Sequence, residues 1–265
     1  MLRWLNQQLQ RLKHLRFTKR GSQTIPDAMW QRTLLDYPFL TADPANDPEQ
    51  LRAMAGIFLA DKEFSGAHGL HISDAMAVAI AAQACLPVLH LGLHWYDDFK
   101  GIVLHPGAML ARREVVDDTG VVHHYRETLT GEAMQYGPVT LSWADIAASG
   151  VSAQTGYNVV IHEFVHKLDM RSGTADGCPP QPSRIVWENW RVTMQACYSR
   201  FQTQLTMAER FGAEPPWLDA YAATAPAEFF AVTSEAYFVN RGRFAQEFPE
   251  LIPLFAQFFN ASAAP

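Results

Sequence analysis

The stretch Val159-Val-Ile-His162-Glu163-Phe-Val-His166-Lys-Leu-Asp169 is the segment around which the rest of the chain is interpreted. It predicts an apolar helix that carries an H-E-x-x-H pair, the spacing at which two imidazoles bind one zinc ion. At about 100° per residue, His162, His166 and Asp169 fall within roughly a 60° wedge, and Glu163 lies at its edge. The opposite side is apolar and predicts a buried face, made of Val160, Ile161, Phe164, Val165 and Leu168.

The composition is that of an ordinary globular protein. The 265 residues are 48% hydrophobic and 18% charged, with a net charge of −6. This length can bury a sizeable core, and the acidic balance argues against a direct nucleic-acid partner. Three cysteines without a C-x-x-C pair argue against disulfide scaffolding and against cysteine ligation of zinc, so a metal site would have to use histidine and carboxylate.

The first 20 residues predict a basic amphipathic helix, with leucines at helical spacing and six basic residues but no acid. They lack the continuous apolar run of a secretory signal. The most hydrophobic window, residues 75–93, is interrupted by Gln83, Pro87 and His90. We therefore expect no stable membrane insertion and a cytoplasmic location, because a span needs about 20 nearly uninterrupted apolar residues.

Helix and strand patterns predict an α+β fold. Helices are expected from Pro48 to Ala60, from Ser73-Asp74 to Cys85, from Arg184 to Met207 and from Pro226 to Asn240. Strands are expected at 87–92, 101–106, 111–116, 121–128 and 139–143, with a loop at 63–71 and a turn at 117–120. The strands would form a small mixed sheet beside the H-E-x-x-H helix, and an edge strand could align a peptide by β-addition.

A catalytic zinc site needs a third protein ligand and one open position for water. The candidates are Asp169, Asp176, Glu188, Glu228 and Glu235. Asp169 lies one turn beyond His166 and is better placed to accept the Nδ1–H of that imidazole. Glu228 and Glu235 are seven residues apart, about 10.5 Å along their helix, so both cannot bind one ion. We choose Glu228, in the first helical turn.

The remaining roles follow from hydrolytic zinc chemistry. Zinc lowers the pKa of a bound water toward about 7. Glu163 would then take a proton from that water and pass it to a leaving amine. Tyr221, on a loop that precedes Glu228, could donate its phenol to the oxyanion.

The motifs resemble the Mlc titration factor A family of bacterial cytosolic zinc peptidases of the gluzincin type. The resemblance rests on His162-Glu-Phe-Val-His-Lys-Leu-Asp169 and on Tyr221-Ala-Ala-Thr-Ala-Pro-Ala-Glu228-Phe-Phe-Ala. The second run is also similar to the catalytic domain of anthrax lethal factor. The resemblance implies His162, His166 and Glu228 as zinc ligands, Glu163 as the general base and Tyr221 as the transition-state tyrosine. Where lethal factor has an acid four residues beyond its ligand, this chain has Val232, and Glu235 is a possible substitute.

The resemblance implies a zincin-like fold, aminopeptidase-like activity on peptide substrates and binding to the transcriptional repressor Mlc, which controls glucose phosphotransferase genes. We expect one domain over residues 1–265: the basic helix at 1–20, helices and sheet at 21–150, and a zinc-binding helical part at 151–265. Two other functions stay open. One is a regulatory protein that titrates a repressor and uses the zinc fold chiefly as a scaffold, and the other is metal-dependent hydrolysis of a non-peptide amide.

Overall fold

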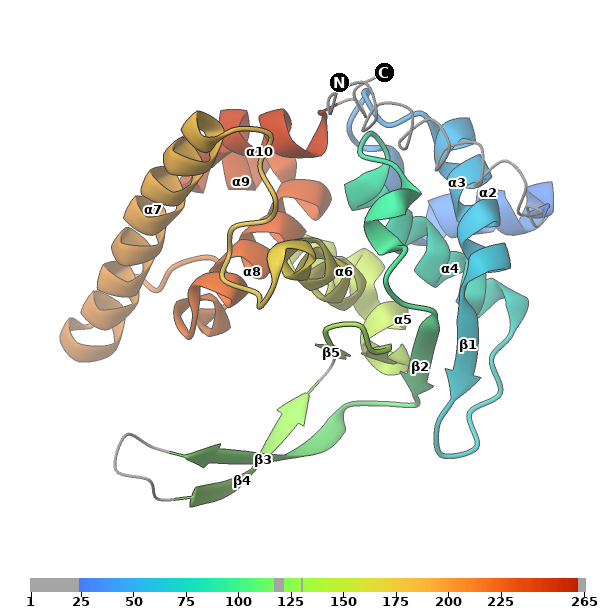
Figure 1. Cartoon of the computed structure of the whole chain (residues 1–265), viewed down its shortest axis with the longest axis horizontal. Coiled ribbons are helices and arrows are strands. Elements are labelled where there is room, and N and C mark those ends of the chain that lie inside the picture. The colour runs from blue at the N-terminus through green and yellow to red at the C-terminus, as the bar shows by residue number, and fades with distance from the viewer. Residues whose placement is uncertain (1–23, 117–121, 130, 262–265) are drawn as a thin grey trace, which may run out of the picture.

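The computed structural model describes residues 24–116, 122–129 and 131–261. The predicted basic helix at 1–20 and the predicted turn at 117–120 lie outside these ranges. Helix α6 lies centrally between two groups of helices (Figure 1). One group contains α2 (Asp27–Asp36), α3 (Pro48–Asp61) and α4 (Asp74–Cys85), and the other contains α7 (Arg184–Phe211), α8 (Pro226–Val239), α9 (Arg241–Glu247) and α10 (Leu251–Phe259). The central helices are α5 (Trp143–Ser152) and α6 (Val159–Asp169).

Several helices begin at a side-chain cap, which is why their starts were predictable from sequence. Ser73 caps α4 by accepting a hydrogen bond from the Met76 N–H, and Asn158 caps α6 in the same way through the Ile161 N–H. Pro226 occupies the first position of α8, where its missing N–H leaves no bond unmade. The predicted helices at 48, 74, 184 and 226 are therefore confirmed, and α7 continues four residues beyond the predicted end.

The sheet is mixed and small, so the α+β prediction is confirmed. Its strand order is β1 (Glu63–Gly66), β2 (Gly101–His105), β6 (Val139–Ser142) and β5 (Gly131–Ala133). The first three strands are parallel, and β5 pairs antiparallel with β6 at the end of this order. Strands β3 (Met109–Val116) and β4 (Val122–Leu129) form a separate antiparallel hairpin that extends away from the body in Figure 1.

Two sequence predictions were wrong. Residues 87–92 were expected to form a strand, but they form part of a short 3-10 helix (Leu86–Val88) and the turn after it, with Gly92 at φ 92°. A short apolar run does not distinguish a buried strand from a buried turn. Residues 63–71 were expected to be a loop but begin with β1, which is mostly exposed and therefore lacks the apolar alternation of a half-buried strand.

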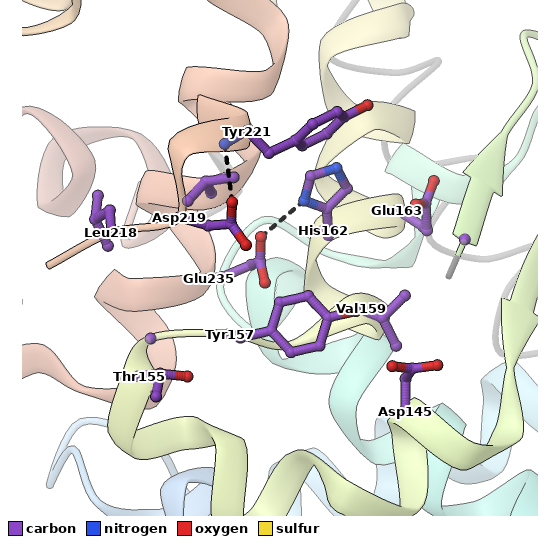
Figure 2. Close-up of a pocket in the computed structure, with 13 residues that line it drawn as sticks. Asp145, Thr155, Tyr157, Val159, His162, Glu163, Leu218, Asp219, Tyr221 and Glu235 are labelled. Carbon is purple, nitrogen blue, oxygen red and sulfur yellow. Dashed lines mark hydrogen bonds and ion pairs between the residues drawn. The ribbon is translucent and has the colours of Figure 1, made fainter. Parts of the chain in front are cut away.

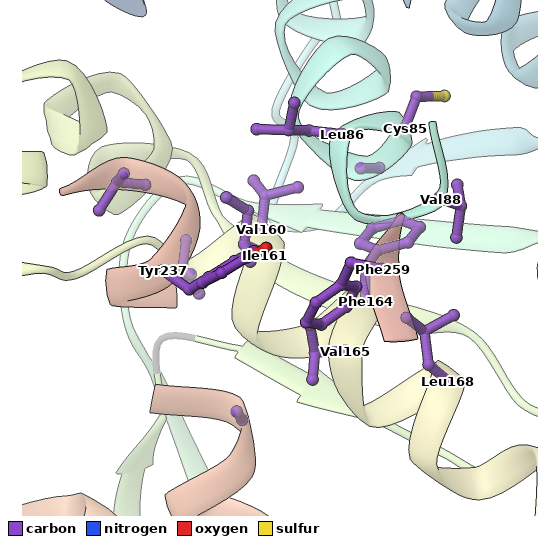
Figure 3. Close-up of a cluster of buried hydrophobic side chains, with 14 of the residues drawn as sticks. Cys85, Leu86, Val88, Val160, Ile161, Phe164, Val165, Leu168, Tyr237 and Phe259 are labelled. Atoms are coloured by element: carbon purple, nitrogen blue, oxygen red, sulfur yellow. The ribbon is translucent and has the colours of Figure 1, made fainter. Parts of the chain in front are cut away.

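The apolar face of α6 forms the centre of the core. Val160, Ile161, Phe164, Val165 and Leu168 are all fully buried. Figure 3 shows them beside Leu86 and Val88 of the segment that follows α4, and beside Phe259 of α10. The Phe164 ring lies 5.1 Å from Tyr96 and 5.9 Å from Phe99, measured between ring centroids. This packing holds the helix on one side and leaves its other side for polar residues.

In the described ranges, we find no helix whose length and hydrophobicity would suffice to cross a bilayer.

Candidate metal centre

Two helices bring three possible ligand atoms to one point. His162 and His166 lie one turn apart on α6, and Glu228 lies in the first turn of α8, which packs against α6. The Nε2 atoms of the two histidines are 3.1 Å apart. Glu228 Oε2 is 3.1 Å from Nε2 of His162 and 3.2 Å from Nε2 of His166. The sequence prediction placed these residues at one ion, and the structure brings them together.

The orientation of His162 is set by a buried carboxylate. Glu235 Oε1 lies 2.7 Å from Nδ1 of His162, and Glu235 is 1% exposed. Its other oxygen accepts the backbone N–H of Asn158, the cap of α6. Burial raises the pKa of Glu235, and His162 and this N–H oppose that rise by favouring the ionised carboxylate. A carboxylate only accepts, so Nδ1 carries the hydrogen, and in the neutral ring the Nε2 lone pair points toward Glu228 and His166.

The electrostatics of this cluster favour a positive charge at its centre. Burial alone would lower the pKa of His162, but Glu235, Glu228 and Glu163 together raise it well above its ordinary value. Burial would raise the pKa of Glu228, yet the two imidazoles hold it well below its usual range. Carboxylates that stabilise a proton on the His162 imidazole in this way would also favour a divalent cation that displaces it.

Glu163 lies beside these residues and faces the sheet. It is 5% exposed, and burial raises the pKa of its carboxyl against the opposing effect of His162 and His166. Gly131 of β5 lies against this side chain: a Cβ added there would lie 2.4 Å from Glu163 Oε1 and 2.6 Å from Cγ. The edge strand therefore approaches the carboxylate more closely than a side chain at position 131 would allow.

A cleft of about 560 Å³ opens onto the cluster. Figure 2 shows His162 between Tyr221 and Glu235, with Glu163 on the β5 side and Asp145 and Tyr157 on the opposite wall. The Tyr221 side chain is 40% exposed, and its ring centroid lies 6.1 Å from that of His162. Tyr221 follows Asp219, whose carboxylate accepts the Tyr221 N–H at 2.9 Å and so starts a short 3-10 helix, Ala220–Ala223.

The other candidate acids lie elsewhere. Asp176 Oδ1 accepts the Cys178 N–H, and Glu188 pairs with Arg184 on α7. Asp169 was expected to accept a hydrogen bond from Nδ1 of His166. It instead accepts the Gly177 N–H at 2.7 Å, because the chain after α6 folds back over the end of the helix. The buried Nδ1 of His166 and Oδ1 of Asp169 have no hydrogen-bond partner among the described residues.

Sequence reasoning missed two residues of the site, Asn158 and Gly131. Asn158 caps α6, binds Glu235 through its N–H, and donates from its amide to Gln83 Oε1 at 2.8 Å. An asparagine immediately before an apolar helix is a recognisable cap signal. Gly131 has no such signal, because its importance depends on a strand approaching a helix more than 30 residues later in the chain.

The three ligand atoms fit a tetrahedral metal ion. Nitrogen and oxygen ligands about 2.0–2.1 Å from zinc in a tetrahedron lie roughly 3.3 Å from one another, close to the separations found here. Two imidazoles and one carboxylate are also the donor set of several catalytic zinc sites. His162, His166 and Glu228 are thus suited to hold a metal ion, and His162 also lines the cleft.

Comparison with known proteins identifies the family. Residues 9–260 match the family described as glucose-regulated metallo-peptidase M90. The chain is 35% identical to Mlc titration factor A of Enterobacter sp. (strain 638). The match spans 243 residues and covers 91% of this chain and 89% of that protein. It is 37% identical to the protein of the same name from Salmonella arizonae, over 88% of this chain and 90% of the relative. Mlc titration factor A of Escherichia coli O1:K1 / APEC is 37% identical, over 87% of this chain and 84% of that protein. The chain therefore belongs to the glucose-regulated metallo-peptidase M90 family.

Proposed function

We propose that this chain is a zinc-dependent peptidase in which His162, His166 and Glu228 hold the metal. The observation that carries the proposal is the convergence of Nε2, Nε2 and Oε2 within 3.1–3.2 Å beside a cleft that His162 and Glu163 line. Zinc held there would act as a Lewis acid and lower the pKa of a bound water to about 7. The family membership supports peptide-bond hydrolysis as the reaction class.

Glu163 is proposed as the general base. Its buried carboxylate would accept a proton from the attacking water and deliver that proton to the leaving amine, so the same group serves both halves of the reaction. Burial raises the pKa of this carboxyl, and the neighbouring imidazoles oppose that rise, so they favour the ionised form that a base requires.

Tyr221 is proposed to stabilise the oxyanion. Its ring lies beside His162 at the cleft, and its phenol is a donor that can reach a carbonyl oxygen turning into an oxyanion. Its exposure of 40% supports a role that begins when substrate arrives.

The edge strand β5 is proposed to align the substrate. β5 is the last strand in the order of the four-stranded sheet, and its Gly131 lines the cleft next to Glu163. An extended peptide can pair with such an edge through main-chain hydrogen bonds, which places its carbonyl carbon between the base and the metal ligands. Asp145 and Asp219 also line the cleft, and these carboxylates favour the free α-ammonium group that an aminopeptidase recognises.

The Glu163→Gln variant tests this function. Gln keeps the size of the side chain but cannot accept the proton, so we expect hydrolysis of aminoacyl p-nitroanilides to fall by about 10²–10⁴-fold. Zinc per chain and the free energy of unfolding should remain near the wild-type values. Glu188→Gln, the same change at an α7 carboxylate that pairs with Arg184 and does not line the cleft, is the matched control and should retain the activity. Normal turnover in Glu163→Gln would show that the base is misassigned.

A second function is proposed from the names of the relatives, which mark them as titration factors for Mlc. On this proposal the chain binds a repressor of the Mlc type in the cytoplasm. Glu163→Gln separates the two functions, because a titration protein should bind the repressor with unchanged affinity while a peptidase loses turnover. Purified Mlc and biosensor measurements of its Kd would decide, and the absence of binding by the wild type would reject the second function.

A further inference from the structure

Lys167 follows the second histidine of the candidate metal centre and is fully buried. Its Nζ atom donates to the backbone carbonyl of Met134 at 2.6 Å and to that of Gly137 at 3.0 Å. It also lies 4.4 Å from the centroid of the Phe99 ring. No ion pair within the described parts of the chain includes Lys167. Asp98 is a nearby negative charge, but without a direct ion pair the desolvation of this buried ammonium group is offset mainly by the two carbonyls and the ring.

The two carbonyls belong to the turn that joins β5 to β6. Gly137 N–H donates to the Met134 carbonyl at 3.0 Å and closes this turn, and Tyr136 has a positive φ of 56°. Gln135 ties the same turn to the segment after α6 by donating to the Gly173 carbonyl at 3.0 Å. Residues 134–137 are thus connected to α6 and to the chain just beyond it.

Lys167 and Glu163 lie four residues apart on α6 and therefore on the same face of the helix. Glu163 packs against Gly131 at the start of β5, and Lys167 binds the turn at the end of β5. The three-residue strand β5 thus runs from one fixed point at Gly131 to a second at Met134, and both points contact the same helix. The distance between the edge strand and the catalytic carboxylate depends on both points.

We propose that Lys167 is a positioning residue. By holding the turn after β5, it keeps this edge strand at the distance from Glu163 at which an extended peptide can align over the carboxylate. The inference rests on the proposed peptidase function and goes beyond it by assigning a role in peptide alignment to a residue that contacts neither metal ligands nor substrate. A Met side chain would fill the same volume without burying a charge, so packing alone gives no reason for lysine at this position.

Lys62 offers a matched control. Its side chain is also buried, at 2% exposure, and it donates to the carbonyls of Tyr96 at 2.6 Å and Phe99 at 2.8 Å. It too contacts the Phe99 ring, with Nζ 4.2 Å from the centroid. Its bonds hold the segment before β2, however, and none of them reaches β5 or the turn after it. A general effect of losing a buried lysine should therefore appear in both variants.

The experiment compares Lys167→Met with Lys62→Met in the zinc-loaded, full-length protein. We expect amide hydrogen exchange of residues 131–139 to accelerate about tenfold or more in Lys167→Met, the size expected for losing a hydrogen bond to a charged group. KM for a hexapeptide should rise roughly five- to tenfold because fewer main-chain hydrogen bonds form in register. kcat for a single-residue p-nitroanilide should change less than about twofold, and zinc content should not change.

Lys62→Met should leave the exchange of 131–139 and the hexapeptide KM at their wild-type values. Lys167→Gln, which retains a neutral donor, should be intermediate, and it replaces the Met variant if that protein does not fold. Equal changes in the Lys167 and Lys62 variants, or an unchanged hexapeptide KM in Lys167→Met, would overturn the proposal. A wild type that binds zinc but hydrolyses neither substrate would refute the proposed function instead, while the exchange measurement would still test whether Lys167 anchors the strand.

Discussion

The two faces of helix α6 are governed by different kinds of contact. On the apolar face, Phe164 packs against aromatic rings. Other apolar side chains of similar volume could replace these partners, because such packing depends on size and hydrophobicity. The polar face places His162 within 3.1 Å of one carboxylate and 2.7 Å of another, and each partner is needed for its own geometry. One face therefore determines whether the helix is stable, and the other determines what the helix can bind. Substitutions on the two faces should separate stability from metal affinity.

The largest effect is expected from Phe164→Ala on the apolar face. This side chain is fully buried and contacts Phe58, Tyr96 and Phe99, so its removal leaves a cavity in the core. The free energy of unfolding should fall by about 3–5 kcal/mol. Urea denaturation followed by tryptophan fluorescence measures it. A loss below about 1 kcal/mol would show that the apolar face does not anchor the helix.

Glu235→Gln on the polar face should weaken metal binding and lower stability less than Phe164→Ala does, because Gln has one accepting oxygen for the two donors from which Glu235 now accepts. Gln can still accept the Nδ1–H of His162, but it lacks the charge that makes the imidazole a stronger ligand. The zinc Kd should rise about 10–100-fold, as found for partners of metal-bound histidines. Competition with a chromophoric chelator measures this Kd. An unchanged Kd would mean that Glu235 contributes packing alone.

Gly131→Ala tests the approach of β5 to the polar face. The new Cβ would lie 2.4 Å from Glu163 Oε1, so the carboxylate must move, and we expect kcat to fall about tenfold. Zinc content should stay at the wild-type level because no ligand atom is displaced. Gly107→Ala is the control, since a Cβ at that position meets no atom within 4 Å. Equal activity of the two variants would show that Glu163 tolerates the displacement.

A smaller effect is the pH dependence of stability that comes from Lys62, whose Nζ lies over the ring of Phe99, a partner of Phe164 on the apolar face. Burial lowers the pKa of Lys62 below its ordinary value of 10.5, against the opposing hydrogen bond and charge of Asp61. Between the folded and the unfolded pKa, the unfolded chain binds more protons than the folded one. The free energy of unfolding contributed by this residue therefore rises with pH in that alkaline window.

Denaturation of wild type and Lys62→Met at pH 7 and pH 10 measures this contribution. The free energy of unfolding of the wild type minus that of Lys62→Met should be larger at pH 10 than at pH 7. A shift in the opposite direction would indicate that the Asp61 interaction outweighs burial. Zinc affinity should be the same in both proteins at neutral pH.

The sequence was most informative where the determinants of structure are local. The period of the apolar residues predicted the buried face of α6, and caps such as Ser73 predicted helix starts that the structure confirms. The choice of Glu228 used its place in the first turn of a helix, the spacing to Glu235 and the preceding loop that carries Tyr221. The structure brings Glu228 to the two histidines, while its role as a metal ligand stays a prediction.

The rest depended on contacts between distant segments. Strand β1 forms because β2 pairs with it, although its own residues are mostly exposed and lack a strand pattern. The role of Gly131 requires knowledge of which strand passes over Glu163, and the two carbonyls at Lys167 belong to a turn 30 residues earlier. Such positions become visible only when the topology is known.

The zinc content of Glu228→Ala, compared with that of Glu235→Ala, tests the central claim most directly. Elemental analysis after gel filtration should find one zinc per wild-type chain, almost none in Glu228→Ala, and zinc retained at high metal concentration in Glu235→Ala. This result would place the Glu228 carboxylate at the metal and Glu235 behind His162. Stoichiometric zinc in Glu228→Ala together with its loss in Glu235→Ala would contradict the account.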